Sequence, residues 1–338
     1  MSGKLAGLGH TAAQWLGRAG ILVPFLILFT YLSLSSGPFA TKTNLLLILE
    51  QQSSTLIIAA AFTLVLVSGG IDLSVGAVWG LAAVVSARFA YQGTDPALAM
   101  LLGIGSGLLV GLANGVVTTV FRINSLIATL AMSFIVNGVS GLVAGNNLIV
   151  LFDKHPDFGD LARPQFLTVK TLIWVMLIAV VVIGLVLATT TAGRYMYAAG
   201  GNAAAARLAG VRVDGVRILA FAIAGMAAGL GGVLDTSDVL SASVQTTAND
   251  NLTFTVIAGV VIGGTSILGG EGAVWRSVVG VLFIALVDNG YSLHGFDPLW
   301  EPITLGVLLL AAVALDAVQR GLVRPGAAIR KALARPRA

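Results

Sequence analysis

Two long apolar runs, Leu56–Val67 and Val75–Val85, flank a short segment that holds two glycines and an acid, Gly69-Gly70-Ile71-Asp72-Leu73-Ser74. A charged side chain at the centre of a membrane helix costs about 2.5–3.5 kcal/mol on insertion scales. Backbone that leaves the helix at membrane depth persists only where protein or water covers it. The segment is therefore either a tight turn at the membrane surface, with Asp72 capping the next helix, or a break within a transport pathway. We predict that Asp72 acts as both cap and hinge.

The composition places the whole chain in the membrane. Of its 338 residues, 57% are hydrophobic and 10% are charged, whereas ordinary soluble domains carry about 25% charged residues. The apolar runs are helix-length rather than alternating, so we predict an all-α integral membrane protein. The 42 glycines let membrane helices approach closely. The absence of cysteine excludes a disulfide framework and a cysteine metal site, and we expect no metal or other cofactor.

The apolar runs predict about ten transmembrane helices in one polytopic domain, 1–338, with no soluble linker. The first, near Ile21–Leu34, lacks a small-residue cleavage site and is predicted to be a retained helix. The predicted spans are 20–35, 44–67, 72–90, 97–121, 124–146, 170–189, 214–235, 252–268, 273–291 and 302–319.

The distribution of basic residues predicts the orientation of these spans in the membrane. With a cytoplasmic N-terminus, 14 Lys and Arg residues fall inside and 5 outside, out of 19 in all. This distribution matches the excess of basic residues that cytoplasmic loops carry, and an even number of spans places both termini in the cytoplasm. The net charge of +4 is then explained by orientation and by attraction to anionic lipid, without nucleic acid as a partner.

Two polar segments between spans are long enough to contact a partner. Outside, 146–170 carries charges of both signs and is either a docking surface or a solvated loop. Inside, 193–215 contains Ala203–Ala209, a run of strong helix formers with Asn202 placed to cap it and Gly210 placed to end it. This short helix is either an ordinary connection or an element that inserts into a partner's groove.

Four stretches, in this order, resemble the membrane permease subunits of ribose-type ATP-binding-cassette importers, whose relatives also serve xylose, arabinose and galactose. The likeness covers nearly the whole chain. The stretches are 67–76 (VSGGIDLSVG), 193–211 with its Gly-Gly-Asn and Arg-Leu-Ala-Gly-Val, 263–270 (GGTSILGG), and Asp288-Asn289-Gly290.

The resemblance implies an assembly in the bacterial cytoplasmic (inner) membrane. A second permease subunit, identical or paralogous, would complete the pathway, two cytoplasmic ATPase subunits would engage 193–215, and a soluble binding protein would deliver the solute. This chain has no G-x-x-x-x-G-K-[ST] phosphate loop, so we expect a transport subunit rather than an enzyme. The resemblance implies ATPase coupling by Arg194, Gly200, Gly201, Asn202, Ala203, Arg207 and Gly210, and structural turns at Gly69, Gly70, Gly263, Gly264, Gly269 and Gly270.

Three positions depart from the family pattern. Ala203, Thr253 and Thr255 stand where the family often has acids. These departures fit a divergent member or one half of an unequal pair, and they argue against naming ribose as the substrate.

The solute pathway is predicted from polar residues in apolar spans, because a neutral polyhydroxylated solute needs hydrogen-bonding groups and flat apolar faces. Glu50–Thr55 forms a polar patch that either lines the outer mouth or lies as a collar at the interface. A lone asparagine in a span is alternatively a hydrogen bond between helices, and Trp79 alternatively a packing or interface residue. The pathway candidates are Gln51, Gln52, Thr55, Asp72, Trp79, Asn114, Asn137 and Asn289.

Three alternative functions are a secondary transporter, a membrane enzyme, and a permease of the same fold for another solute. A proton-coupled secondary transporter needs ionisable relays within the bilayer, and the deep candidates are few, chiefly Asp72 and Asp288. A membrane enzyme needs a nucleophile–base pair or a metal site, and no H-E-x-x-H motif occurs. An importer permease of the same fold for a nucleoside, a polyol, an autoinducer or a branched-chain amino acid remains the main alternative.

Overall fold

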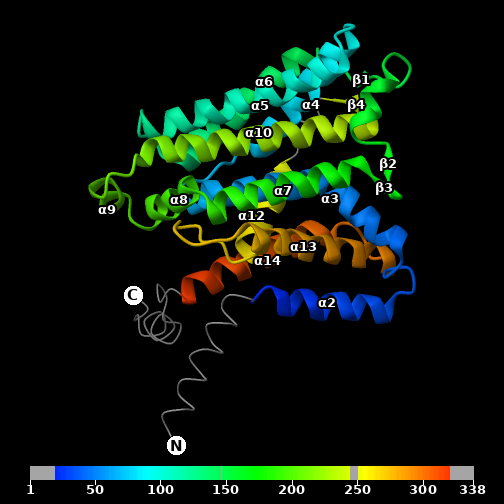
Figure 1. Cartoon of the computed structure of the whole chain (residues 1–338). Coiled ribbons are helices and arrows are strands. Elements are labelled where there is room, and N and C mark those ends of the chain that lie inside the picture. The colour runs from blue at the N-terminus through cyan, green and yellow to red at the C-terminus, as the bar shows by residue number, and fades with distance from the viewer. Residues whose placement is uncertain (1–19, 146, 244–249, 320–338) are drawn as a thin grey trace, which may run out of the picture.

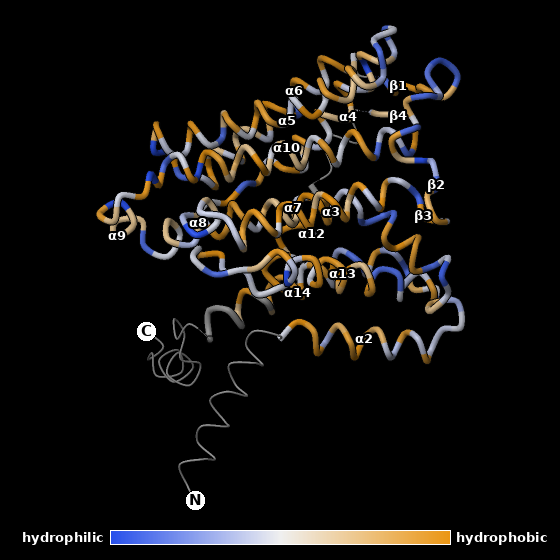
Figure 2. Tube along the Cα trace, viewed as in Figure 1, coloured by the Kyte–Doolittle hydropathy of each residue, from blue (hydrophilic) through white to orange (hydrophobic). Residues whose placement is uncertain are grey.

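The computed structural model describes residues 20–145, 147–243 and 250–319, and Figure 1 shows helices lying side by side with nearly parallel axes. Apolar residues run along these helices and hydrophilic residues gather at their ends (Figure 2). The helices are α2 (Leu22–Ser35), α3 (Lys42–Val67), α4 (Val75–Tyr91), α5 (Pro96–Thr119), α6 (Ser125–Ala144), α7 (Thr171–Thr189), α8 (Thr191–Gly201), α9 (Ala203–Leu208), α10 (Val213–Val239), α12 (Asp250–Ile262), α13 (Val274–His294) and α14 (Trp300–Gln319).

Six of the described helices are long and apolar enough to cross a membrane: α3, α5, α6, α7, α10 and α13. Four shorter apolar helices, or parts of them, lie at Leu22–Ser35, Val75–Tyr91, Asn251–Ile262 and Trp300–Ala311. All ten fall where apolar spans were predicted, which confirms a multi-pass, mainly helical membrane protein.

The predicted span boundaries differ from the helices by a few residues, most of all at the end of 252–268. The expected span 252–268 ends at Ile262, because Gly263 and Gly264 turn the chain and Gly264 has φ +82°. This left-handed backbone conformation is open to glycine and strained for other residues.

Local sequence signals set several helix ends. The Asp95 carboxylate accepts hydrogen bonds from two first-turn amides of α5, and Pro96 occupies the first helical position. The Asn124 side chain caps α6 in the same way. At the other ends, Gly145 and Gly295 adopt φ +63° and +67° and terminate α6 and α13.

The α5–α10 interface explains much of the high glycine content. A Cβ added to Gly107 would overlap the Gly225 carbonyl oxygen, and one added to Gly111 would overlap that of Phe221. On α10, a Cβ on Gly229 would lie 3.0 Å from the Ile104 backbone. The two backbones therefore touch directly, which is how small residues bring membrane helices together.

Short strands and a 3₁₀ helix cover the end of the bundle opposite α9, where Figure 1 labels the strands. Antiparallel strands β1 (Ile149–Val150) and β4 (Ser241–Ala242) pair with each other, as do β2 (Gln165–Phe166) and β3 (Val169–Lys170). The 3₁₀ helix η1 (Pro156–Leu161) is bound to α10, because the Ser237 hydroxyl donates to the Phe158 carbonyl at 2.7 Å. The described part of 146–170 is thus a folded cap held against α10.

Candidate functional site

The predicted coupling segment is built as the sequence indicated. α8 ends at Gly201, the Asn202 side chain accepts from the Ala205 amide at 3.0 Å, and α9 follows. Gly210 has φ +85° where the short helix was predicted to stop. Leu208, at the end of α9, is 92% exposed.

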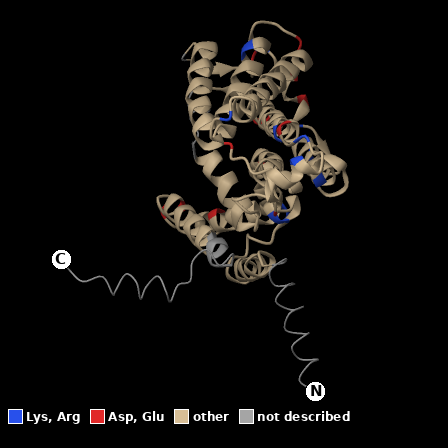
Figure 3. Cartoon of the chain, turned by 90° about the vertical axis from the view of Figure 1, so that its left-hand side faces the viewer, with Lys and Arg blue, Asp and Glu red and all other residues tan. Residues whose placement is uncertain are grey.

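Basic side chains mark the end of the bundle that carries α8 and α9, which Figure 3 views directly. The described basic residues predicted for this side are Arg122, Arg194, Arg207, Arg212, Arg217 and Arg276. Lys4, Arg18 and the six basic residues after 319 lie outside the described residues. Arg207 forms an ion pair with Asp214 at 2.7 Å, which joins α9 to the start of α10.

Asp72 lies just before α4 and bonds the N-cap residue Ser74, not the first-turn amides that a capping side chain would bond. It is 1% exposed, and its Oδ1 accepts from the Ser74 amide at 2.9 Å and from the Ser74 hydroxyl at 2.6 Å. Asn114 of α5 donates to the Ser74 hydroxyl at 2.8 Å. Asp72 and Asn114 therefore meet at the start of α4.

The residues between α3 and α4, 68–74, form an irregular, mostly buried stretch that we call the break segment. Its Ile71 amide donates to the Ser125 hydroxyl at 3.1 Å, and its Leu73 amide donates to Thr129 at 2.9 Å. Side chains of α6 thus satisfy backbone groups that no helix ladder satisfies, as irregular backbone inside a membrane protein requires.

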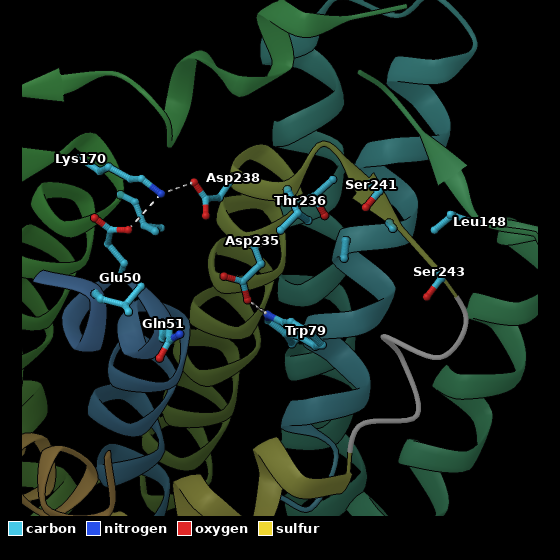
Figure 4. A pocket seen from close by; sticks show the side chains of 15 residues that line it. Glu50, Gln51, Trp79, Leu148, Lys170, Asp235, Thr236, Asp238, Ser241 and Ser243 are labelled. Carbon is cyan, nitrogen blue, oxygen red and sulfur yellow. Dashed lines mark hydrogen bonds and ion pairs between the residues drawn. The ribbon is translucent and has the colours of Figure 1, made fainter. Parts of the chain in front are cut away.

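A cavity of about 560 Å³ opens among α3, α4, α10, the start of α7 and β4 (Figure 4). It brings together two of the predicted pathway residues, Gln51 and Trp79, and its volume lies within the range of small-molecule sites. Its other polar lining residues are Glu50, Lys170, Asp235, Thr236, Asp238, Ser241 and Ser243.

Asp235 fixes the Trp79 side chain in this cavity. One carboxylate oxygen accepts from the indole Nε1 at 2.8 Å, and the other accepts from the Ser54 hydroxyl at 2.7 Å. The carboxylate thereby joins α3, α4 and α10. Sequence analysis missed Asp235 because it ended the span at this residue, whereas α10 continues to Val239. The signal in the sequence that could have identified Asp235 is an acidic residue at the end of an apolar run.

A three-residue ion network lines one side of the cavity. Lys170 lies 3.0 Å from Glu50 and 3.1 Å from Asp238. Burial alone would lower the pKa of Lys170, but hydrogen bonds to Glu50 and Asp238 raise it above its ordinary value. Lys170 is therefore cationic at neutral pH, and it ties α7 to α3 and α10.

We predict that Lys170→Met lowers the thermal stability of the purified protein by about 1–3 kcal/mol, because Glu50 and Asp238 lose their shared cation and half-buried polar groups lose a partner. Thermal unfolding in detergent measures this change. Lys154→Met is the control, because it removes an exposed lysine outside the network, whose ammonium group lies 3.9 Å from the centre of the Tyr91 ring. Equal midpoints for both variants would contradict a stabilising role for the network.

The other predicted pathway residues lie apart from this cavity. Thr55 is buried within α3, and Asn137 of α6 has a buried Oδ1 with no hydrogen-bond partner among the described residues. Asn289 exchanges side-chain amide hydrogen bonds of 3.0 Å with Asn44. That pair lines a second cavity of about 430 Å³, together with Gln51 and Gln52.

Comparison with known proteins identifies the family. Residues 44–313 match the family described as branched-chain amino acid transport system / permease component. The chain belongs to this permease family. Its predicted identity as the permease of an ATP-binding-cassette importer is confirmed, and it is a transport component of the kind that works with ATPase and solute-binding proteins.

Curated relatives cover most of the chain. The chain is 33% identical to "Ribose import permease protein RbsC" of Escherichia coli (strain K12), over 92% of this chain and 97% of that protein. It is 34% identical to "L-arabinose ABC transporter permease protein AraH" of Azospirillum brasilense, over 91% and 89%. It is 33% identical to "Fructose import permease protein FrcC" of Rhizobium meliloti, over 88% and 84%. No solved structure matches the chain.

Proposed function

We propose that this permease admits a monosaccharide or a similar neutral polyol through the cavity around Trp79. The observation that carries the proposal is the Trp79–Asp235 pair at a cavity rich in hydrogen-bonding groups. An indole offers a flat apolar surface to a sugar ring, and carboxylate oxygens accept hydrogen bonds from the sugar hydroxyls. The relatives named for ribose, arabinose and fructose support the same substrate class.

The charge of the cavity favours a sugar over a branched-chain amino acid. Glu50, Asp235 and Asp238 line it together with a single cation, Lys170. That cation already pairs with two of the carboxylates. The carboxylate of an amino acid would therefore meet like charge without a free partner, whereas sugar hydroxyls meet acceptors.

The assembly proposed for the chain follows the family resemblance. Ten spans form one polytopic domain in the bacterial cytoplasmic membrane, with both termini in the cytoplasm. A second permease subunit completes the pathway, and two separate subunits hydrolyse ATP. The 193–215 segment contacts those ATPases, and a binding protein outside delivers the solute to the end that carries β1–β4.

We predict that Leu208→Asp reduces co-purification of the ATPase at least tenfold, because an exposed leucine at the tip of α9 supplies apolar area that a partner would bury. Leu167→Asp, at a residue 71% exposed on the opposite end, is the matched control. Unchanged co-purification of the Leu208 variant would contradict docking through this tip.

Competition for uptake tests the proposed substrate class. Cells that carry this chain, its ATPase and its binding protein would take up a labelled monosaccharide, with excess ribose, arabinose, fructose, leucine or a nucleoside as competitor. We expect a neutral sugar to compete and leucine to have no effect. Competition by leucine alone would overturn the proposal in favour of an amino acid.

A further inference from the structure

Three glycine pairs that are far apart in the sequence meet at the end of the bundle that carries α8 and α9. Gly69-Gly70 follows α3, Gly200-Gly201 ends α8, and Gly269-Gly270 lies between α12 and α13. The Gly270 amide donates to the carbonyl oxygen of Val67, the last residue of α3, at 2.9 Å. We call this meeting of three chain segments the glycine junction.

The glycine junction has no room for a side chain at Gly200, Gly269 or Gly270, whereas a Cβ on Gly201 would meet nothing within 4 Å. A Cβ added to Gly200 would overlap the Val67 carbonyl oxygen and lie 2.6 Å from the Gly270 nitrogen. A Cβ on Gly269 would lie 2.9 Å from the Gly69 Cα. Real Cβ contacts shorter than 3.0 Å essentially do not occur, so the three backbones touch directly.

Two side-chain hydrogen bonds hold the segments of the junction together. The Tyr197 hydroxyl of α8 donates to the Gly272 carbonyl at 2.8 Å. The Arg217 guanidinium of α10 donates to the Ser68 carbonyl at 3.0 Å. The close contacts at Gly200, Gly269 and Gly270 are backbone against backbone, so rotation of side chains cannot absorb a displacement of α8.

From the junction, the chain leads directly to the cavity. The break segment begins one residue after Val67, and α4 begins where it ends. Trp79 lies in the second turn of α4 and lines the cavity. Its first amides, at 68–70, bond to carbonyls of α3, and its Ile71 and Leu73 amides bond to hydroxyls of α6. The break segment therefore links the end of α3 to α6 and α4.

We propose that the glycine junction transmits movement of the coupling segment to the break segment, and through α4 to Trp79. Gly200 and Gly270 are positioning residues in this role, because their missing side chains keep α8 in contact with the end of α3. The inference rests on the proposed function, in which ATPase subunits move α8 and α9.

Stimulation of ATP hydrolysis by the sugar-loaded binding protein tests this role in the reconstituted complex. Gly200→Ala inserts a methyl group into the junction, and Tyr197→Phe removes the bond to Gly272 without adding bulk. Gly184→Ala is the control, because its Cβ would meet only ordinary contacts of 3.7 Å at Val274. Basal hydrolysis and recovery of the assembled complex are measured alongside.

In the complex that is recovered, we expect Gly200→Ala to lower the ratio of stimulated to basal hydrolysis at least fivefold. Tyr197→Phe should reduce the stimulation about two- to fivefold, and Gly184→Ala should show the wild-type stimulation. Wild-type stimulation in Gly200→Ala would overturn the inference. If the Gly200→Ala complex does not assemble, the Tyr197→Phe complex is the test. Wild-type stimulation in that complex would then overturn the inference. A wild-type complex without any stimulation would contradict the proposed function itself.

Discussion

Replacement of Gly111 by leucine is expected to abolish recovery of folded protein. At this position a Cβ would overlap the Phe221 carbonyl oxygen and lie 3.1 Å from the Gly225 Cα. Overpacking of a core typically costs about 1–3 kcal/mol. Here the obstacle is backbone, which no rotamer change relieves, so α5 and α10 must separate along their shared face. The yield of monodisperse protein after size exclusion in detergent measures the effect.

Gly105→Leu is the matched control for this experiment. Gly105 lies on the same helix, and a Cβ there would meet nothing within 4 Å. Both variants add the same side chain and the same helix propensity. We expect near-normal yield from Gly105→Leu, and equal yields from the two variants would contradict the close α5–α10 contact.

Asp235→Ala is expected to reduce solute uptake at least tenfold. The substitution leaves the Trp79 indole N–H without its acceptor, and the Ser54 hydroxyl keeps only its bond to the Gly231 carbonyl. A buried donor left unsatisfied costs about 1–3 kcal/mol. Trp79 then loses its fixed orientation in the cavity. Initial uptake rates at several solute concentrations, normalised to the amount of protein in the membrane, measure the loss.

Asp235→Asn keeps the shape of the side chain and one of its two accepting oxygens, so it shows how much of the effect comes from losing the acceptor. The amide keeps one oxygen that can accept from Trp79 or Ser54, so we expect an intermediate uptake rate and a thermal stability closer to that of the wild type. Uptake by Asp235→Ala at the wild-type rate, with the protein correctly inserted, would remove the Trp79–Asp235 pair from the pathway.

The spans and the short helix α9 were predictable from sequence because their causes are local. Long apolar runs predict membrane helices wherever they occur. Asn202 and Gly210 bracket α9 through cap chemistry that involves only a few neighbouring residues. The bond from the Ser74 amide to Asp72, two positions away, is local in the same sense.

The cavity and the glycine junction were not predictable in this way because they depend on contacts between distant segments. Asp235 meets Trp79 across 156 positions, and no local pattern specifies that pairing. The glycine pairs were each identified as turns, but their meeting is a property of packed helices. Asn289 was predicted for the pathway and is bonded to Asn44 across 245 positions, so its role in transport remains a prediction.

Reconstitution tests the importer account most directly. This chain would be purified with its ATPase, placed in lipid, and assayed for ATP hydrolysis with the binding protein either empty or loaded with one candidate solute. The account predicts a stable complex whose hydrolysis rises with the binding protein loaded with a neutral monosaccharide. A stable complex that responds only to a loaded amino acid, or a chain that binds no ATPase, would contradict it.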